Sequence, residues 1–335
     1  MNKRLKKLLI ILSAISVTIA GVGCSQAKQN KAEKVEAQAE DFEAVQYTYS
    51  DGVNTHEVLV TSPRKRAVTL SQFMTEMLLA LGLEDQMVAT ALLDNPILPE
   101  FEEAYNKIPI LEIRESHAVS KEAFIATGAD FVSGWDSSIS EQTTGSAEEL
   151  IAKDIAPFMA KSYGADATIE TVYEDFELLG KIFDVQDRAQ EVITQMQNNI
   201  KAVTDKVGTI KEEDRVRVMV CDSGVNDVMV VGSGLANNLI EMAGGKNVFA
   251  EDATKPYIYV SWESIVAENP EVILVTDYIA SESVENKINA LKSHPALQDV
   301  PAIKNNKIYA VGLADLSPGV RNTKVIEQMY GYFFE

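Results

Sequence analysis

The sequence is poor in the side chains that build metal centres. It has two cysteines, Cys24 and Cys221, and three histidines, His56, His117 and His294. No pair of histidines has the spacing that places two ligands on one face of a helix, and no cluster of cysteine and histidine occurs. These absences exclude a zinc-finger site and a helical zinc-peptidase motif, and they argue against a binding site for bare zinc or manganese ions.

Motifs of nucleotide-binding and hydrolytic enzymes are missing too. No phosphate-binding Walker loop is present. The Gly-Ser-Gly at 232–234 precedes a predicted helix, but Asn237 occupies the place of the third glycine of a dinucleotide fingerprint, so we read a tight turn. The Asp-Ser-Gly at 222–224 lacks the flanking glycines of a nucleophile elbow. We therefore expect neither enzymatic activity nor a cofactor.

Positive charge is scarce as well. The chain carries 30 lysines and arginines against 50 aspartates and glutamates, which gives a net charge of −20. This balance repels phosphates and excludes nucleic acid as a partner. Beyond the N-terminal region, no hydrophobic run approaches the length of a membrane-spanning helix.

The N-terminus has the order of a secretory signal. Basic residues within the first seven positions are followed by an apolar run over 8–20, by small residues and then by Cys24. A cysteine in this place is typical of bacterial lipoproteins, although Gly21 stands where such signals usually carry leucine. We predict a signal peptide over 1–23 and a lipid anchor, such as palmitate, on Cys24, with ordinary cleavage as the alternative. This predicts a protein held by lipid alone at the extracytoplasmic face of the cell membrane.

The mature chain divides into two lobes and a bridge. Because an acylated Cys24 leaves Cys221 without a disulfide partner, the fold must rest on packing. Residues 24–44 are rich in Gln, Lys, Glu and Ala and predict a flexible tether. Residues 45–167 and 207–335 alternate short apolar runs with helical patterns, which is typical of α/β lobes with mostly parallel sheets. Residues 168–206 carry apolar side chains at helical spacing and predict a long helical bridge with a break near Asp184, a cap for the second helix.

The predicted elements follow this division. In the first lobe we expect a hairpin over 45–49 and 57–60, strands over 67–70, 86–92, 130–133 and 156–159, and helices over 72–81, 121–127 and 148–153. In the second lobe we expect strands over 217–221, 228–231, 257–260, 272–276 and 307–311, and helices over 236–243, 262–268, 287–291 and 323–333.

Aromatic and polar residues gather where predicted strands end. Open α/β sheets hold ligands at the carboxyl ends of their strands, so a cleft shared by the two lobes is expected. Each residue alone is equally well explained by turn or capping chemistry. The candidate ligand contacts are Trp135, Asp136, Asp222, Asn226, Tyr257, Tyr259 and Arg321, the last for an acidic group on the ligand.

Several segments, taken in order, resemble the substrate-binding proteins of ABC importers for iron complexes and cobalamin. The resemblance runs from about residue 58 to 334. The matching segments are PRKRAV at 63–68, TEMLLALG at 75–82, NLIEMAGGKNVF at 238–249, VSWE at 260–263, HPAL at 294–297 and VPAIKN at 300–305.

The resemblance implies a fold and a partner. The fold is the class III type, with two α/β lobes joined by a rigid helical bridge and the ligand in the cleft between them. The partner is a permease dimer with cytoplasmic ATPases, and an acidic residue on each lobe pairs with permease arginines. Glu76 and Glu263 occupy the matching positions, although a carboxylate near a helix start also suits the helix dipole.

The ligand class stays open among the types that this family binds. Few basic residues fall on the predicted cleft loops, so a less anionic ferric chelate of siderophore type is favoured over a tricatecholate complex. Haem and cobalamin or a related corrinoid are the alternatives, and haem would need an axial ligand such as His117 or Tyr257. A lipid-anchored sensor or adhesion protein built on the same lobes is the alternative of another class.

The lipid anchor gives a first prediction. Cys24→Ala should abolish acylation, so the protein should be released or remain uncleaved, because the cysteine thiol is the acceptor of the lipid. Fractionation and mass spectrometry of the mature chain measure this. Unchanged membrane attachment together with an unchanged mass would rule out lipidation.

Overall fold

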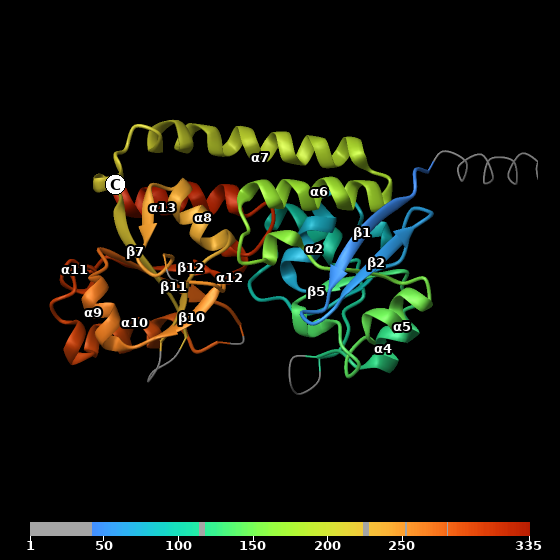
Figure 1. Ribbon diagram of the computed structural model, residues 1–335, viewed down its shortest axis with the longest axis horizontal. Coiled ribbons are helices and arrows are strands. Elements are labelled where there is room, and N and C mark those ends of the chain that lie inside the picture. The colour runs from blue at the N-terminus through green and yellow to red at the C-terminus, as the bar shows by residue number, and fades with distance from the viewer. Residues whose placement is uncertain (1–41, 114–117, 224–227, 252, 280) are drawn as a thin grey trace, which may run out of the picture. The chain divides into compact units, whose positions relative to one another are not determined.

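The computed structural model describes residues 42–335 except 114–117, 224–227, 252 and 280 (Figure 1). The predicted signal peptide and Cys24 lie outside this range, as do His117 and Asn226. Residues 43–335 form one structural unit that contains both α/β lobes. The two-lobed α/β architecture predicted from the sequence is confirmed.

The first lobe is built on a parallel sheet. Within the described residues its strand order is β4-β3-β5-β6, and each neighbouring pair is parallel. Strands that are covered on both faces are buried along their whole length, as β3 is here. The predicted antiparallel hairpin of β1 and β2 is present, and it packs against β6. The bounds are β1 (Val45–Ser50), β2 (Thr55–Val60), β3 (Ala67–Leu70), β4 (Met87–Thr90), β5 (Phe131–Gly134) and β6 (Ala156–Phe158).

Serine caps set the starts of three helices in this lobe. The hydroxyls of Ser71, Ser120 and Ser146 each accept a hydrogen bond from a backbone N–H of the first helical turn, which typically stabilises a helix by about 1 kcal/mol. At Ser146 the carboxylate of Glu149 returns to the serine N–H and completes a capping box. The helices are α2 (Gln72–Ala80), α3 (Glu102–Tyr105), α4 (Lys121–Ala126) and α5 (Ala147–Ala152).

The second lobe has a mixed sheet. Its described strand order is β10-β8-β7-β11-β12, with β9 beside the start of β7. The pairs of β11 with β7 and with β12 are parallel, whereas β8 runs antiparallel to β7 and to β10. The strands are β7 (Val216–Ser223), β8 (Val228–Val231), β9 (Gly245–Asn247), β10 (Tyr257–Val260), β11 (Val272–Asp277) and β12 (Ile308–Gly312).

The helices of the second lobe lie where the periodicity predicted them, with longer bounds at 284–293 than expected. Two short helices, at 301–304 and 313–316, were not predicted. The helices are α8 (Leu235–Met242), α9 (Trp262–Glu268), α10 (Val284–Ser293), α11 (Pro301–Lys304), α12 (Leu313–Leu316) and α13 (Asn322–Phe334).

Two helices lying side by side, α6 (Ile169–Phe183) and α7 (Gln186–Val207), form the bridge (Figure 1). Asp184 was expected to cap the second helix, and this is wrong. It adopts a left-handed conformation with φ of 60° and ends α6, while Val185 precedes α7. A side chain at Gly180 would place its Cβ 2.7 Å from that of Ala189, so the glycine permits the close approach of the two helices.

Each bridge helix contacts both lobes, through hydrogen bonds or through packing. At the start of α6, the N–H of Ile169 donates to Asn238 of α8 at 2.9 Å, and near its end the carbonyl of Ile182 accepts from the N–H of Arg64 at 3.1 Å. At the start of α7, Arg188 donates to the carbonyl of Ala80 at 3.0 Å, and α7 also packs against α13. The bridge therefore fixes the separation of the lobes along two helices.

A buried ion pair joins the lobes directly. Arg321, just before α13, donates through Nε to Oε2 of Glu76 at 2.6 Å and through Nη2 to Oε1 at 2.7 Å. Glu76 lies on α2 of the first lobe and is 3% exposed, and Arg321 is 11% exposed. Arg321 also donates to Asp315 at 3.0 Å and to the carbonyl of Pro96 at 2.6 Å. A bidentate, nearly dry pair of this kind is costly to break.

We predict that Arg321→Met lowers the free energy of unfolding by about 3 kcal/mol, because it leaves the buried carboxylate of Glu76 without its cation. Urea denaturation measures the change. The double variant Glu76→Gln, Arg321→Met should recover part of this loss, since no buried carboxylate remains at position 76.

Lys324→Met is the matched control. It breaks the exposed pair of Lys324 with Glu100, whose N–O distance is 3.2 Å, and should cost less than about 1 kcal/mol. Equal losses for Lys324→Met and Arg321→Met would contradict a special role for the buried pair.

Candidate functional site

A cavity of about 660 Å³ is lined by residues of both lobes. Its walls mix aliphatic and aromatic side chains with two carboxylates, as is common for sites that bind small molecules. From the first lobe come Leu92, Leu93, Asp94, Ile113, Trp135 and Ser137. From the second lobe come Asp222, Met229, Tyr257, Tyr278, Ile279 and Leu313.

Most of these residues stand at the ends of strands. Leu92 follows β4, Trp135 follows β5, Asp222 lies near the end of β7, Tyr278 follows β11 and Leu313 follows β12. The carboxyl ends of the parallel strands of both sheets therefore converge on one cavity, as expected for open α/β sheets. The strands position the side chains, and the segments after them provide the contact surface.

Trp135 is held by two other aromatic rings. Its indole meets Phe73 of α2 edge-on at 5.0 Å and Tyr163 edge-on at 5.6 Å, measured between ring centroids. Tyr163 belongs to a turn whose N–H groups at Lys161 and Ser162 donate to the carboxylate of Asp175 on α6, at 2.8 and 2.9 Å. The bridge thus supports the aromatic wall of the cavity, and a supported ring loses little entropy when a ligand packs on it.

Asp222 is the centre of a polar network on the other wall. It is 3% exposed. Its Oδ1 accepts from the hydroxyl of Thr276 at 2.9 Å, and its Oδ2 lies 3.4 Å from the hydroxyl of Tyr278. Behind it, Nζ of Lys287 donates to the carbonyl oxygens of Asp222 at 2.7 Å and of Thr276 at 2.8 Å. The same ammonium lies 4.8 Å from the ring centre of Tyr278, so Lys287 supports this tyrosine as well.

The two cavity tyrosines stay neutral at physiological pH. Burial, aided by the charge of Asp222, raises the pKa of the Tyr278 hydroxyl to about 12. Burial, and then the same carboxylate, hold the pKa of Tyr257 far above its ordinary value. Both hydroxyls are therefore hydrogen-bond groups toward a ligand, and phenolate is strongly disfavoured at either position.

Hydrogen bonds of Asn95 link the two lobes beside the cavity. Its amide donates to the carbonyl of Asp277 at 2.8 Å and accepts from the N–H of Ala314 at 2.9 Å. Its own N–H donates to the side chain of Gln72 in α2 at 2.7 Å. Beside it, the carbonyl of Asp94 accepts from the N–H of Ile279 at 2.8 Å. Hydrogen bonds of Asn95 and of the Asp94 carbonyl therefore join the two lobes beside the cavity.

Of the predicted ligand contacts, the structure brings Trp135, Asp222 and Tyr257 together on the cavity wall. Contact with a ligand itself remains a prediction for them. Asp136 is exposed, and its neighbour Ser137 lines the cavity instead. Tyr259 is 70% exposed and does not line it. Asn226, and with it His117, lie outside the described residues.

Two predicted roles need correction. Arg321 was expected to contact an acidic group on the ligand, but its guanidinium is occupied by Glu76, Asp315 and the carbonyl of Pro96. Glu76 was expected to dock against a permease, which requires an exposed carboxylate, whereas this one is buried and paired. We withdraw both roles. Glu263, in the first turn of α9, is exposed and keeps its docking role as a prediction.

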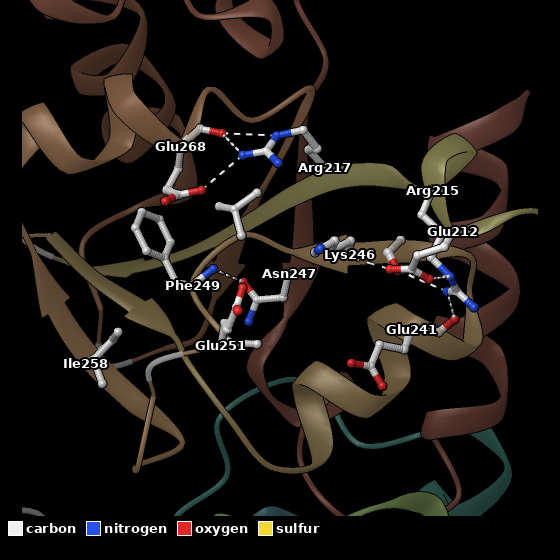
Figure 2. A pocket seen from close by; sticks show the side chains of 13 residues that line it. Glu212, Arg215, Arg217, Glu241, Lys246, Asn247, Phe249, Glu251, Ile258 and Glu268 are labelled. Atoms are coloured by element: carbon white, nitrogen blue, oxygen red, sulfur yellow. Dashed lines mark hydrogen bonds and ion pairs between the residues drawn. The ribbon is translucent and has the colours of Figure 1, made fainter.

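A second hollow, of about 650 Å³, lies on the second lobe alone (Figure 2). Its cations are matched by glutamates: Arg217 pairs with Glu268 at 3.0 Å, and Arg215 pairs with Glu212 at 2.9 Å (Figure 2). Lys246 lies 4.0 Å from the same Glu212. Because these charges compensate one another and the first lobe contributes nothing, we assign the ligand site to the cavity between the lobes.

Three further features concern metal binding, membrane spans and the free cysteine. Among the residues that the structure describes, no group of three or more His, Cys, Asp or Glu side chains is placed to hold a metal ion. In the same part of the chain, no helix combines the length and the apolar character needed to cross a membrane. The free thiol of Cys221 is buried, and burial raises its pKa to about 12, so it is unreactive as a nucleophile or metal ligand.

Comparison with known proteins decides the family. The family model described as periplasmic binding protein matches residues 68–312, most of the chain. This protein belongs to that family. The resemblance seen in the sequence is confirmed, and so is the expectation that the chain is a binding protein and not an enzyme.

Individual relatives agree with this assignment. The chain is 23% identical to an uncharacterized ABC transporter substrate-binding lipoprotein, YvrC of Bacillus subtilis, over 85% of this chain and 86% of that protein. It is 24% identical to a vitamin B12-binding protein of Vibrio parahaemolyticus, over 76% of this chain and 83% of that one.

Solved structures agree on the fold. A periplasmic binding protein of Veillonella parvula has 28% identity and a TM-score of 0.80, and the match covers 87% of this chain and 98% of that one. An ABC-type Fe3+-hydroxamate transport protein of Saccharomonospora viridis has 24% identity and a TM-score of 0.71, over 87% of this chain and 99% of that one.

The network behind Asp222 gives a prediction. Lys287→Met should lower the free energy of unfolding by about 2 kcal/mol, because two buried carbonyl oxygens lose their donor. Lys292→Met, at an exposed position of the same helix, should change it by less than about 0.5 kcal/mol. Urea denaturation of both variants measures the difference. Equal effects would show that Lys287 acts only as a surface charge.

Proposed function

We propose that this protein is the lipid-anchored, extracytoplasmic substrate-binding component of an ABC importer, and that it captures a ferric chelate of hydroxamate type for delivery to a permease dimer and its ATPases. The observation that supports the ligand class is the make-up of the cavity. Its described lining has three aromatic rings, a set of aliphatic side chains and two carboxylates, and no arginine, lysine or histidine.

This lining discriminates among the ligand classes by charge. A ferric tricatecholate complex is strongly anionic, and its burial requires matching cations. Haem brings two carboxylates, which also require matching cations, and an axial demand, for which Tyr257 is the described candidate. Ferric trihydroxamates have a neutral core with apolar methylene surfaces, which suits aliphatic and aromatic walls.

Two of the relatives support the proposal by what they bind or how they are held. The protein of Saccharomonospora viridis is an Fe3+-hydroxamate transport protein, and YvrC of Bacillus subtilis is a lipoprotein. The first supports the ligand class, and the second supports the predicted acylation of Cys24. We expect no cofactor, since a chelate brings its own metal. The exposed Glu263 is the carboxylate we expect to contact the permease.

A corrinoid is the second candidate. It is favoured by the vitamin B12-binding protein of Vibrio parahaemolyticus and by the same lining, because corrinoids are large, apolar in part and not anionic around the ring. A lipid-anchored sensor would bind the same ligands without a permease. A neighbouring permease gene and loss of uptake in a deletion strain separate an importer from a sensor.

Tryptophan fluorescence tests the ligand class directly. The chain has two tryptophans. Trp262 is not among the residues that line the cavity, and its ring is stacked on that of His294 with 4.2 Å between the ring centroids. In a Trp262→Phe variant, a ferric trihydroxamate should quench Trp135 with a Kd below about 1 μM. A ferric tricatecholate and haemin should bind at least about a hundredfold more weakly. The matched control Trp135→Phe, which keeps Trp262, should show little quenching.

A variant of the wall completes the test. Tyr257→Ala should weaken binding of the trihydroxamate by about 2 kcal/mol, measured by calorimetry, because it removes an aromatic contact from the cavity. Quenching by cyanocobalamin alone would favour the second candidate. Tight binding of haemin or of the tricatecholate, without the trihydroxamate, would overturn the proposal.

A further inference from the structure

The two carboxylates of the cavity come from different lobes. Asp94 belongs to the segment after β4, and Asp222 lies near the end of β7. Both lie close enough to Tyr257 and Tyr278 for their charges to add to burial in raising the pKa of these hydroxyls. Of the two, Asp222 has a carboxylate oxygen 3.4 Å from the hydroxyl of Tyr278, so its charge lies at the cavity wall.

The partners of Asp222 on the cavity wall do not neutralise it. The hydroxyls of Thr276 and Tyr278 are uncharged donors. Lys287 is the cation behind this wall, and its printed hydrogen bonds go to the carbonyl oxygens of Asp222 and Thr276. It does not line the cavity, so it offsets part of the charge of Asp222 from behind, while Asp222 itself lines the cavity.

We propose that Asp222 makes the cavity select ligands with a net positive charge. This inference rests on the proposed function, since it names the charge of the chelate that the cavity takes. Charge pairs inside an apolar cavity are poorly screened, so a cationic group beside Asp222 is held more strongly than the same group in water. Among chelates with one core, the cationic member should bind best.

A charge series on one ferric core tests this. The probes are a linear ferric trihydroxamate with a free terminal amine, its N-acetyl derivative and its N-succinyl derivative, which are cationic, neutral and anionic at neutral pH. Calorimetry with the wild-type mature protein should show affinity falling by about tenfold at each step, about 1.4 kcal/mol per step. Equal affinities, or tightest binding of the succinyl derivative, would overturn the inference while leaving the ferric ligand class intact.

Isosteric variants assign the preference to residues. Asp222→Asn should bring the affinities of the amine and the acetyl derivative to within about threefold of each other. Glu282→Gln, which removes one exposed carboxylate from the same lobe, should leave the wild-type ratio unchanged. A folded Asp222→Asn protein with the wild-type ratio would remove Asp222 from the role, and thermal unfolding checks that it is folded.

A corrinoid pair separates failure of the inference from failure of the proposed ligand. If no ferric trihydroxamate binds but a corrinoid does, the cationic aquocyanocobinamide and the neutral dicyanocobinamide replace the series, and the cation should again bind tighter. Tighter binding of the neutral form would overturn the inference. A protein that binds neither core contradicts the proposed function, and the inference with it.

Discussion

The buried carboxylate of Glu76 is the constraint on which the arrangement of the lobes depends. A carboxylate that is 3% exposed must have compensation, and Arg321 of the other lobe provides it through two hydrogen bonds. The same carboxylate accepts from Gln72 at 3.1 Å and from the N–H of Leu98 at 3.1 Å. The direct contact between the lobes and the position of the segment after β4 thus depend on one charged group and its donors, whereas the bridge fixes the separation of the lobes.

The cavity inherits its rigidity from these contacts. Asn95 forms hydrogen bonds from the first lobe to the second beside the cavity, as does the carbonyl of Asp94. Trp135 is packed between two aromatic rings that α2 and the bridge position. Lys287 joins the ends of β7 and β11 through two hydrogen bonds. A site assembled in this way needs little reorganisation to receive a ligand, so less of the binding energy is lost to ordering side chains. It also leaves little freedom for a large hinge motion between the lobes.

Much of the fold was readable from the sequence because it rests on local patterns. The strand at 67–70 was predicted with its observed bounds, and the bridge helices followed from apolar spacing. Asp184 was misassigned because the position that ends α6 and the position that begins α7 are adjacent. An aspartate suits either a left-handed residue at a helix end or an N-cap, so the sequence alone does not separate the two. The short strand β9 was missed because its sequence, Gly-Lys-Asn, has no apolar run, whereas the equally short β6 has one.

The site was readable in part for the same reason. Strand ends pointed to Trp135, Asp222 and Tyr257, and Tyr278 stood at such an end without being chosen. Leu92, Met229 and Leu313 carried no signal, because an apolar residue within or just after a strand looks like core. Glu76 and Arg321 lie 245 residues apart, and no local sequence pattern indicates that they form an ion pair with each other. Pairings of this range need the three-dimensional structure.

The bonds of the bridge to the first lobe bear on the order in which the chain can fold. Residues 45–160 contain the strands of that lobe and, in a chain exported from its N-terminus, emerge before the bridge, yet the N–H of Arg64 and the carbonyl of Ala80 find their partners only at Ile182 and Arg188. Until those later residues emerge, the first lobe keeps open hydrogen-bonding groups. Its completion therefore waits for the bridge, so an emerging chain would remain a target for chaperones until the start of α7 has crossed the membrane.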